Sequence, residues 1–460
     1  MFIRFARNMI GPRARNSVRK RIERHLGGDV LHTETITHNV RAVERVNLDL
    51  VLDRWLNNAG RHNGRESPAG LVGYSIQMYE STGLADLAAG SDLFIAPVVR
   101  ESLAIAPGRN GDLVERGIYL LRFDGNPIVA MVRSSHPPMT NKILDVMARD
   151  RQTARNAYTR LLDEAHRGNV YKGQVIALGE SEHCWPREIT IAFHELPATP
   201  REQIVLPEDV MTVLERNVLG LLRHGDALRA SGRSTRHGVL LHGPPGTGKT
   251  LAVRYLARAC PDHTVILLTG RQMGLIRESC HIAKLLAPSI VILEDVDLVA
   301  RERDDNKHAP LLHDLMDEMD GLGTKAACIF LLTTNRPESI EPALSARPGR
   351  VDQAIAFPLP DDACRRRLFD LYGRGLDLAG VTLDRWIEQT DGVSPAFIQE
   401  LLRKAALMSV ERAVASGDGT EQTAQPLLVT DDDVASALRE LMLFGGELTQ
   451  KLLGYKSTSN

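Results

Sequence analysis

The chain has 460 residues and a formal net charge of −2, with 43% hydrophobic and 25% charged residues. Such a length favours about three domains, and this composition excludes a small disulfide-stapled module and a wholly disordered chain. The near-zero net charge argues against bulk attraction to nucleic acid.

The cysteines and the apolar runs predict the cellular location of the chain. Its five cysteines are scattered, without a CxxC pair or a His/Cys cluster, so neither a disulfide framework nor a zinc ribbon is indicated. No apolar run approaches the ~18 residues that a spanning helix needs. We therefore expect a cytoplasmic protein without a secretion signal.

Residues 1–28 are predicted to form a basic N-terminal arm. Residues 1–25 carry eight basic side chains against one acid, Glu23. Residues 2–10 place apolar side chains on one helical face and arginines on the other. A frayed terminus, a targeting segment, membrane-surface contact and nucleic-acid contact all stay open as interpretations. Gly27 and Gly28 are expected to end the segment.

Residues 29–195 are predicted to form an α+β recognition domain. Helical spacing occurs over residues 43–55, and a long polar helix is expected over 141–166. The β-rich runs are residues 117–123, 127–133, 171–178 and 188–194. The first two are separated by Asp-Gly-Asn, a strong hairpin signal. This region contains no catalytic constellation, so we expect it to bind a partner.

Residues 196–360 are predicted to form an α/β domain with a parallel five-stranded sheet. The strand candidates are residues 238–242, 264–269, 289–293, 328–334 and 354–357. They are mostly continuous apolar runs, which suit parallel strands buried on both faces and connected by helices. From residue 361 the signal is helical only, which predicts a small helical lid over 361–445 and a tail over 446–460.

A phosphate-binding loop is expected between the first of these strands and the helix after it. Its residues are Gly243, Pro244, Pro245, Gly246, Thr247, Gly248, Lys249 and Thr250, with Leu251 in the following helix. The glycines let backbone N–H groups wrap phosphate oxygens, Lys249 reaches the terminal phosphates, and the Thr250 hydroxyl ligates Mg²⁺. The expected ligands are ATP and Mg²⁺.

Two further strand ends carry groups suited to nucleotide hydrolysis. Glu294 and Asp295 end an apolar strand, where one carboxylate would hold the metal and the other would polarise the attacking water. Which acid takes which role stays open. Asn335 ends another strand and could contact the γ-phosphate, and Arg347 and Arg350 flank a Pro-Gly bend that fixes their directions.

These motifs resemble the ATPase module of the AAA family, which includes the proteasomal regulatory ATPases and the valosin-containing protein. The resemblance rests on GPPGTGKT, PSIVILEDVD, DEMDGLG and TTNRPESIEPALSARPGRVDQ, in order and spacing. It covers residues 200–445 and implies a P-loop AAA+ fold that hydrolyses ATP. It also implies that Asn335 is the sensor-1 residue, and that Arg347 and Arg350 act on ATP held by the neighbouring protomer. A homo-oligomeric ring, usually a hexamer, that remodels a protein client is then expected.

Three departures from the family pattern are visible. The acids stand in the order Glu294-Asp295, an inversion that resembles the mitochondrial AAA translocase of the Rieske protein and predicts slow hydrolysis or exchanged roles. Residues 270–276 lack the triplet that relatives use to grip a threaded chain, and Pro395 replaces a common Gly-Ala segment. The alternatives are a slowly hydrolysing, ATP-gated assembly scaffold and a nucleic-acid-associated ATPase.

Overall fold

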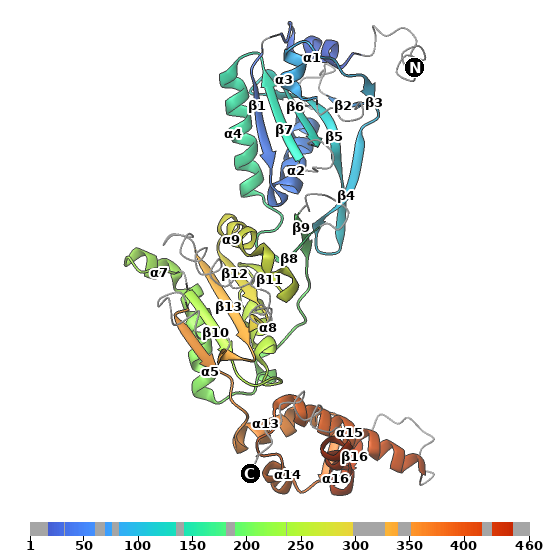
Figure 1. Cartoon of the computed structure of the whole chain (residues 1–460), viewed down its shortest axis with the longest axis vertical. Helices are drawn as coiled ribbons and strands as arrows, with labels where there is room; N and C mark the ends of the chain where they lie inside the picture. The colour runs from blue at the N-terminus through green and yellow to red at the C-terminus, as the bar shows by residue number, and fades with distance from the viewer. Residues whose placement is uncertain are drawn as a thin grey trace. The chain divides into compact units, whose positions relative to one another are not determined.

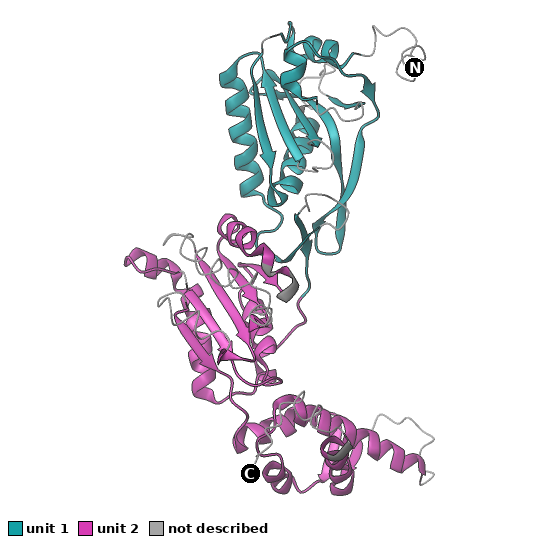
Figure 2. Cartoon of the chain, viewed as in Figure 1, with its two compact units in different colours: residues 1–195 teal, residues 196–460 magenta. Residues whose placement is uncertain are grey.

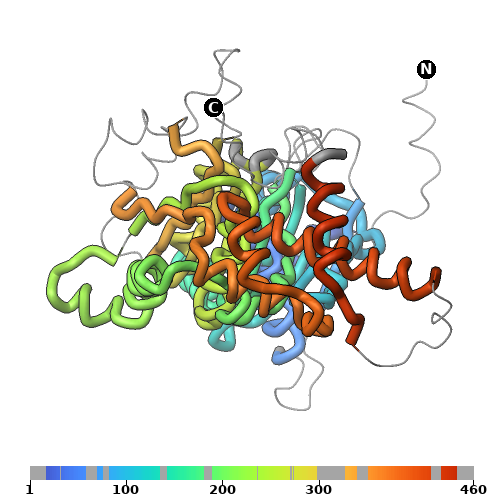
Figure 3. Tube along the Cα trace, turned by 90° about the horizontal axis from the view of Figure 1, so that it is seen from below, coloured from blue at the N-terminus to red at the C-terminus, as the bar shows by residue number. Residues whose placement is uncertain are grey.

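The computed structural model describes most of the chain as two compact units, residues 1–195 and 196–460 (Figure 2). The remaining residues are the grey trace in Figures 1 and 3. The described residues are 17–31, 33–59, 70–75, 82–134, 142–180, 189–235, 237–297, 327–338, 351–415 and 426–444.

The first unit contains helices and strands in mixed order (Figure 1). Its elements are α1 (Val18–Leu26), β1 (Thr35–Val40), α2 (Ala42–Ala59), β2 (Gly70–Tyr74), α3 (Leu84–Ala88), β3 (Ile95–Ala96), β4 (Val99–Ala106), β5 (Arg109–Phe123), β6 (Asn126–Ser134), β7 (Lys142–Ala148), α4 (Arg151–Arg167), β8 (Val175–Glu180) and β9 (Ile189–Phe193).

An antiparallel sheet forms the middle layer of this unit. Its strand order is β1-β7-β6-β5-β2-β3, with β4 also paired to β5. Successive residues of β5 alternate between the two faces: Tyr119 and Leu121 pack with α2 and α4, whereas Ile118 and Leu120 pack with α1 and α3. The sheet is therefore antiparallel and covered by helices on both sides, an arrangement consistent with the predicted α+β class.

The predicted hairpin is confirmed. Strands β5 and β6 pair antiparallel from Phe123↔Asn126 onward, and the turn residues Asp124 and Gly125 both have positive φ, 47° and 81°. Two central residues with positive φ are typical of a type I′ turn, whose twist matches that of the flanking strands.

The second half of the basic segment is part of the first unit. Helix α1 ends at Gly27, which has φ 73°, and its apolar residues Val18, Ile22 and Leu26 are buried in the core. Because that face is buried, α1 exposes only its polar side. Residues 2–10, where the amphipathic pattern was expected, lie outside the described residues.

The long helix predicted over 141–166 is wrong in its first third. Residues Lys142–Ala148 form strand β7, which pairs with β1 and β6, and α4 begins only at Arg151. Asp150 caps this helix by accepting a hydrogen bond from the Thr153 N–H at 2.8 Å. The strand is buried on both faces, so it lacks the alternation that marks a half-exposed strand.

The second unit begins with short helices and continues as strands alternating with helices. Its elements are the 3-10 helix Arg201–Gln203, α5 (Glu208–Glu215), the π-helical turn Arg216–Gly220, α6 (Leu221–Arg223), α7 (Gly225–Ala230), β10 (His237–His242), α8 (Lys249–Arg258), β11 (Thr264–Leu268), the 3-10 helix Gly270–Leu275, α9 (Ile276–Leu285), β12 (Ser289–Leu293), β13 (Cys328–Thr334), β14 (Gln353–Ala356), α13 (Asp362–Tyr372), β15 (Leu376–Gly380), α14 (Leu383–Gln389), α15 (Pro395–Ala415), β16 (Leu427–Thr430), α16 (Asp431–Arg439) and the π-helical turn Glu440–Phe444.

The five predicted strands of this unit are confirmed, and they run parallel in the order β14-β10-β13-β12-β11. Strands β12 and β13 are buried along their whole length, which explains their continuous apolar sequences. The fold class is therefore the predicted P-loop α/β type.

The segment after residue 361 is mostly helical but not entirely. Strands β15 and β16 form a two-stranded parallel pair, which the sequence did not predict. Their residues pack with α13, α14, α15 and α16 around Trp386, Phe369 and Phe397, each of which is at most 1% exposed. A core of its own therefore holds these helices together.

Two sequence expectations concern thiols and membranes. Cys260, Cys280, Cys328 and Cys364 are buried free thiols. Within the described ranges, every helix is too short or too polar to cross a bilayer.

Asp49 of α2 is an unusual buried carboxyl group in the first unit. Asp49 is 3% exposed, and its Oδ2 has no hydrogen-bond partner among the residues that the structure describes. Burial raises the pKa of Asp49 to about 7, against the opposing effect of the Arg45 guanidinium. Asp49 therefore keeps a proton in the folded protein at pH values where an unfolded chain has lost it.

We predict that the first unit loses stability as pH rises from about 4 to 7. In this window the folded state binds one more proton than the unfolded state, so the free energy of unfolding falls with rising pH, by on the order of 3 kcal/mol in all. Asp49→Asn should remove this dependence. Calorimetric melting of the full chain across this pH range measures it.

Asp163→Asn is the matched control, because Asp163 is an exposed aspartate of the same unit. It should leave the pH dependence of the melting temperature intact. An Asp49→Asn protein with the wild-type pH profile would contradict the assignment.

Candidate functional site

The predicted site residues gather at one edge of the parallel sheet. Strand register pairs His242 with Thr334 and Leu293 with Leu332, so β10, β12 and β13 end side by side. The loop after β10, the acids after β12 and Asn335 after β13 therefore meet at the same edge. In parallel α/β sheets this carboxyl edge is where ligands bind.

The loop after β10 has the backbone of a phosphate cradle. Gly243, Gly246 and Gly248 have φ of 150°, 76° and 94°, values that side chains rarely allow. A Cβ on Gly243 would lie 2.3 Å from the carbonyl oxygen of Phe357, so close approach alone requires glycine there. Helix α8 begins at Lys249 and directs its N-terminal N–H groups toward this loop.

Lys249 is almost completely buried, at 6% exposure. Its Nζ donates hydrogen bonds to the carbonyl oxygens of Gly243 and Pro244, both at 2.8 Å. Burial lowers the pKa of Lys249 to about 8, and the carboxylates of Asp295 and Asp297 partly oppose this shift. The charge is thus held close to the loop, where a phosphate would neutralise it.

Asp295 and Asn335 are in direct contact. The Asn335 Nδ2 donates a hydrogen bond to Asp295 Oδ1 at 3.2 Å. Both side chains are half-buried, as is that of Glu294, whose backbone N–H donates to the Leu268 carbonyl at 3.1 Å. An amide and a carboxylate in contact at the carboxyl edge can together bind and orient one water molecule.

The structure adds two residues that the sequence analysis missed, Thr333 and Asp297. Thr333 Oγ1 accepts a hydrogen bond from the Asp295 N–H at 3.0 Å. Asp297, which is 4% exposed, accepts from the Thr334 hydroxyl at 3.0 Å and from the Asn335 N–H at 3.2 Å. These bonds join the end of β12 to the end of β13. A third acid, two positions after Asp295, was the available signal.

The helical segment predicted to be the lid contacts the loop through the start of α15. The Ala396 N–H donates a hydrogen bond to the Gly246 carbonyl at 3.2 Å, and Ser394 is fully buried beside it. A Cβ on Gly246 would lie 2.8 Å from Ser394 Oγ and 2.9 Å from the Ala396 Cβ. Pro395 is the first residue of α15, where its missing N–H is not needed.

The oxygen donors suit magnesium. The Thr250 hydroxyl lies in the first turn of α8, and the carboxylates of Glu294 and Asp295 follow β12. Mg²⁺ prefers hard oxygen ligands and binds through one or two carboxylates together with substrate phosphates and water. Leu251 continues α8. Arg347 and Arg350 lie outside the described residues.

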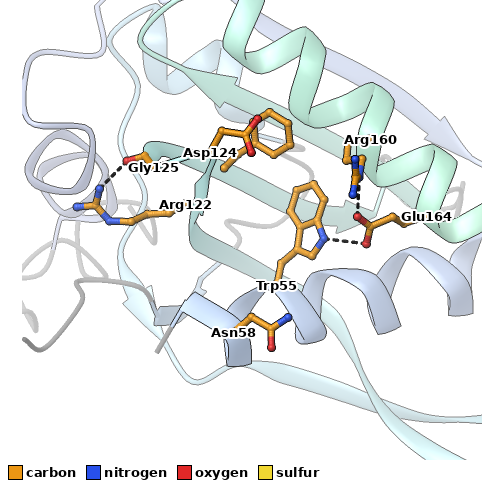
Figure 4. Close-up of a pocket in the computed structure, with 8 residues that line it drawn as sticks. Trp55, Asn58, Arg122, Asp124, Gly125, Arg160 and Glu164 are labelled. Atoms are coloured by element: carbon orange, nitrogen blue, oxygen red, sulfur yellow. Dashed lines mark hydrogen bonds and ion pairs between the residues drawn. The ribbon is translucent and has the colours of Figure 1, made fainter. Parts of the chain in front are cut away.

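A second candidate site lies in the first unit, in a pocket of about 570 Å³ (Figure 4). Trp55 and Phe123 form an aromatic wall, with ring centroids 5.7 Å apart. The Trp55 indole N–H donates to Glu164 at 3.1 Å, and Arg160 donates to the same carboxylate at 2.8 Å. An aromatic wall beside a few charged groups is typical of binding pockets.

Comparison with known proteins agrees with the geometry of the sheet edge. Residues 239–359 match the family model described as "ATPase family associated with various cellular activities (AAA)". The second unit carries an AAA domain. The match lies entirely within this unit.

Two known proteins are similar to this chain at moderate sequence identity. The chain is 34% identical over 242 residues to human ATPase family gene 2 protein homolog A, covering 50% of this chain and 27% of the relative. It is 31% identical over 231 residues to the ATP-dependent zinc metalloprotease FtsH 2 of Sphaerobacter thermophilus, covering 46% of this chain and 35% of the relative. The chain thus spans between about a quarter and about a third of the length of these relatives.

We predict that Gly246→Ala weakens nucleotide binding by the AAA domain about tenfold or more. The added Cβ would be strained at φ 76° and would meet Ser394 and Ala396, so the loop or the lid must move. The rise in melting temperature caused by Mg-ATP should shrink accordingly. A differential scanning measurement with and without nucleotide checks this.

Gly232→Ala is the control that separates backbone strain from steric contact with the lid. Gly232 also has a left-handed φ, 77°, but a Cβ there would meet no described atom within 4 Å. This control should lose stability while keeping the full nucleotide-induced rise. Equal nucleotide effects in both variants would contradict the contact between the loop and the lid.

Proposed function

We propose that this protein, as an oligomeric ring, hydrolyses Mg-ATP and uses the energy to remodel a macromolecular client, a protein. The observation that carries the proposal is the contact between Asn335 and Asp295 at the sheet edge that also holds Lys249. The names of the two relatives, one an ATPase and the other ATP-dependent, agree with it.

The proposed division of labour follows from the chemistry of each group. Lys249 and the loop N–H groups bind the β- and γ-phosphates, and Thr250 with one of the two acids binds Mg²⁺. Bound Mg²⁺ supplies positive charge that stabilises the developing negative charge on the phosphates. Asn335 and the other acid orient the attacking water.

Arg347 and Arg350 complete the proposed site from a neighbouring protomer. Transition-state charge on the γ-phosphate needs a further cation, and a guanidinium supplied in trans is an established solution. Within the AAA family resemblance, these two arginines fill that role. A closed ring, usually of six protomers, then follows from one heterologous contact repeated around an axis.

The first unit is proposed as the recognition domain. Its pocket beside Trp55 and Phe123 is a surface on which a client segment could bind. Contact of residues 1–25 with a membrane surface or with nucleic acid is an alternative, in keeping with their eight basic side chains. A cytoplasmic location fits the scattered cysteines.

A slowly hydrolysing, ATP-gated scaffold is the second candidate function. The inverted order Glu294-Asp295 favours it, because the water-polarising acid would be one methylene shorter than usual. Steady-state turnover in the presence of candidate clients distinguishes the two. Turnover that a client accelerates supports remodelling, whereas nucleotide-dependent assembly with negligible turnover supports the scaffold.

We predict that Lys249→Ala lowers ATP turnover at least a hundredfold. Loss of the ammonium group removes a charge held beside the terminal phosphates, and preorganised charges of this kind contribute about 10²–10³ to rate. A coupled assay for released phosphate measures turnover. Undiminished turnover in this variant would refute the proposed site.

We predict that Arg347→Ala abolishes turnover and that mixing restores part of it. In a mixed ring, an intact loop from the Arg347→Ala chain can face an intact arginine from a Lys249→Ala chain. Random assembly of equal amounts should recover about a quarter of wild-type turnover per protomer. Absence of any recovery would argue against a site shared between protomers.

A further inference from the structure

Asp295 adopts a backbone conformation that most side chains avoid. Its φ is 52°, in the left-handed region, and Asp295 and Asp124 are the two non-glycine residues with positive φ among those described. Asp124 occupies a hairpin turn, where this conformation is common. Asp295 instead follows a buried strand and lies at the candidate active site.

Hydrogen bonds from β13 hold this conformation in place. The N–H groups of Asp295 and Val296 both donate to Thr333, one to its hydroxyl and one to its carbonyl, each at 3.0 Å. The Asp297 carboxylate in turn accepts hydrogen bonds from the hydroxyl of Thr334, at the end of β13, and from the N–H of Asn335. The chain after β12 is thus fixed on both sides of Asp295, so the left-handed residue cannot relax without breaking several bonds.

The left-handed conformation restricts which acid can stand at position 295. Among non-glycine residues, aspartate and asparagine enter this region most readily, because their short polar side chains bond locally. Glutamate is longer and lacks this advantage. In this backbone the Asp295 carboxylate already reaches the Asn335 amide at 3.2 Å, so no extra methylene is needed.

We propose that the left-handed turn at position 295 selects aspartate over glutamate as the water-polarising acid, so that the order Glu294-Asp295 is matched to this backbone. This inference rests on the proposed ATP hydrolysis. Asp295 accepts a hydrogen bond from the attacking water. The water oxygen bonds to the γ-phosphorus while the bond to the bridging oxygen breaks. ADP leaves with that electron pair, and the water proton ends on the released orthophosphate or in solvent. Glu294 serves the metal.

The decisive experiment exchanges the two acids. The double variant Glu294→Asp/Asp295→Glu restores the order usual in the AAA family. If the length of the acid at position 295 alone decided the rate, Asp295→Glu and the double variant would both be at least as fast as wild type. If the backbone decides, the double variant should be no faster than Asp295→Glu, and both should lie at least tenfold below wild type. A double variant as fast as wild type or faster would overturn the proposal.

Asp295→Asn separates chemistry from folding. Asparagine keeps the left-handed conformation but cannot accept a proton or carry charge, so turnover should fall about a hundredfold or more. Its melting temperature and its Mg-ATP-induced rise should remain near wild type. Asp295→Glu should instead lower the melting temperature by about 2–4 °C. Equal melting temperatures for the two variants would contradict the backbone argument.

Failure of the proposed function would be recognised separately. If the wild-type chain never hydrolyses ATP, the proposal for catalysis fails, yet the melting temperatures of the two variants still test the backbone restriction at position 295. If wild type hydrolyses ATP and Asp295→Asn keeps full turnover, hydrolysis stands and the assignment of Asp295 is wrong.

Discussion

The buried ammonium group of Lys249 is the constraint on which the carboxyl edge of the AAA domain depends. Removing a charge from water is expensive unless nearby groups compensate it, and here two loop carbonyls accept its hydrogen bonds. The carboxylates of Asp295 and Asp297, which follow β12, also stabilise the positive charge of Lys249. The glycine-rich loop, the acids that follow β12 and Asn335 are therefore arranged around one cation.

The sequence predicted this edge well where the physical rule is local. Continuous apolar runs identified the five parallel strands, because strands buried on both faces must be apolar throughout. The glycines of the loop and the acids after β12 stood directly after such runs, so their common edge followed from parallel register. Thr333 and Asp297 were missed because their hydrogen bonds join two strand ends that only the tertiary pairing brings together; the acid at position 297 was the one local signal. The positive φ of Asp295 could not be predicted for the same reason.

The elements that were wrongly predicted as helical also depend on tertiary contacts that the local sequence does not show. Strand β7 has no alternation because helices cover both faces of its sheet, and the polar helix α4 follows it after two residues. Strands β15 and β16 are short and lie far apart in the sequence, so only tertiary pairing reveals them. Helical propensity in the surrounding residues favoured the wrong state in both cases. Arg347 and Arg350 lie outside the described residues, so their roles remain predictions.

The hydrogen bond from Ala396 to Gly246 has a thermodynamic consequence. It makes one backbone carbonyl of the phosphate-binding loop a partner of the helix that begins the lid. If nucleotide alters the affinity of the loop for that helix, the helix must alter the affinity for nucleotide by the same factor, because coupling between two sites is reciprocal. Any protein that bound α15 would therefore change the affinity of the loop for nucleotide, without contacting the loop itself.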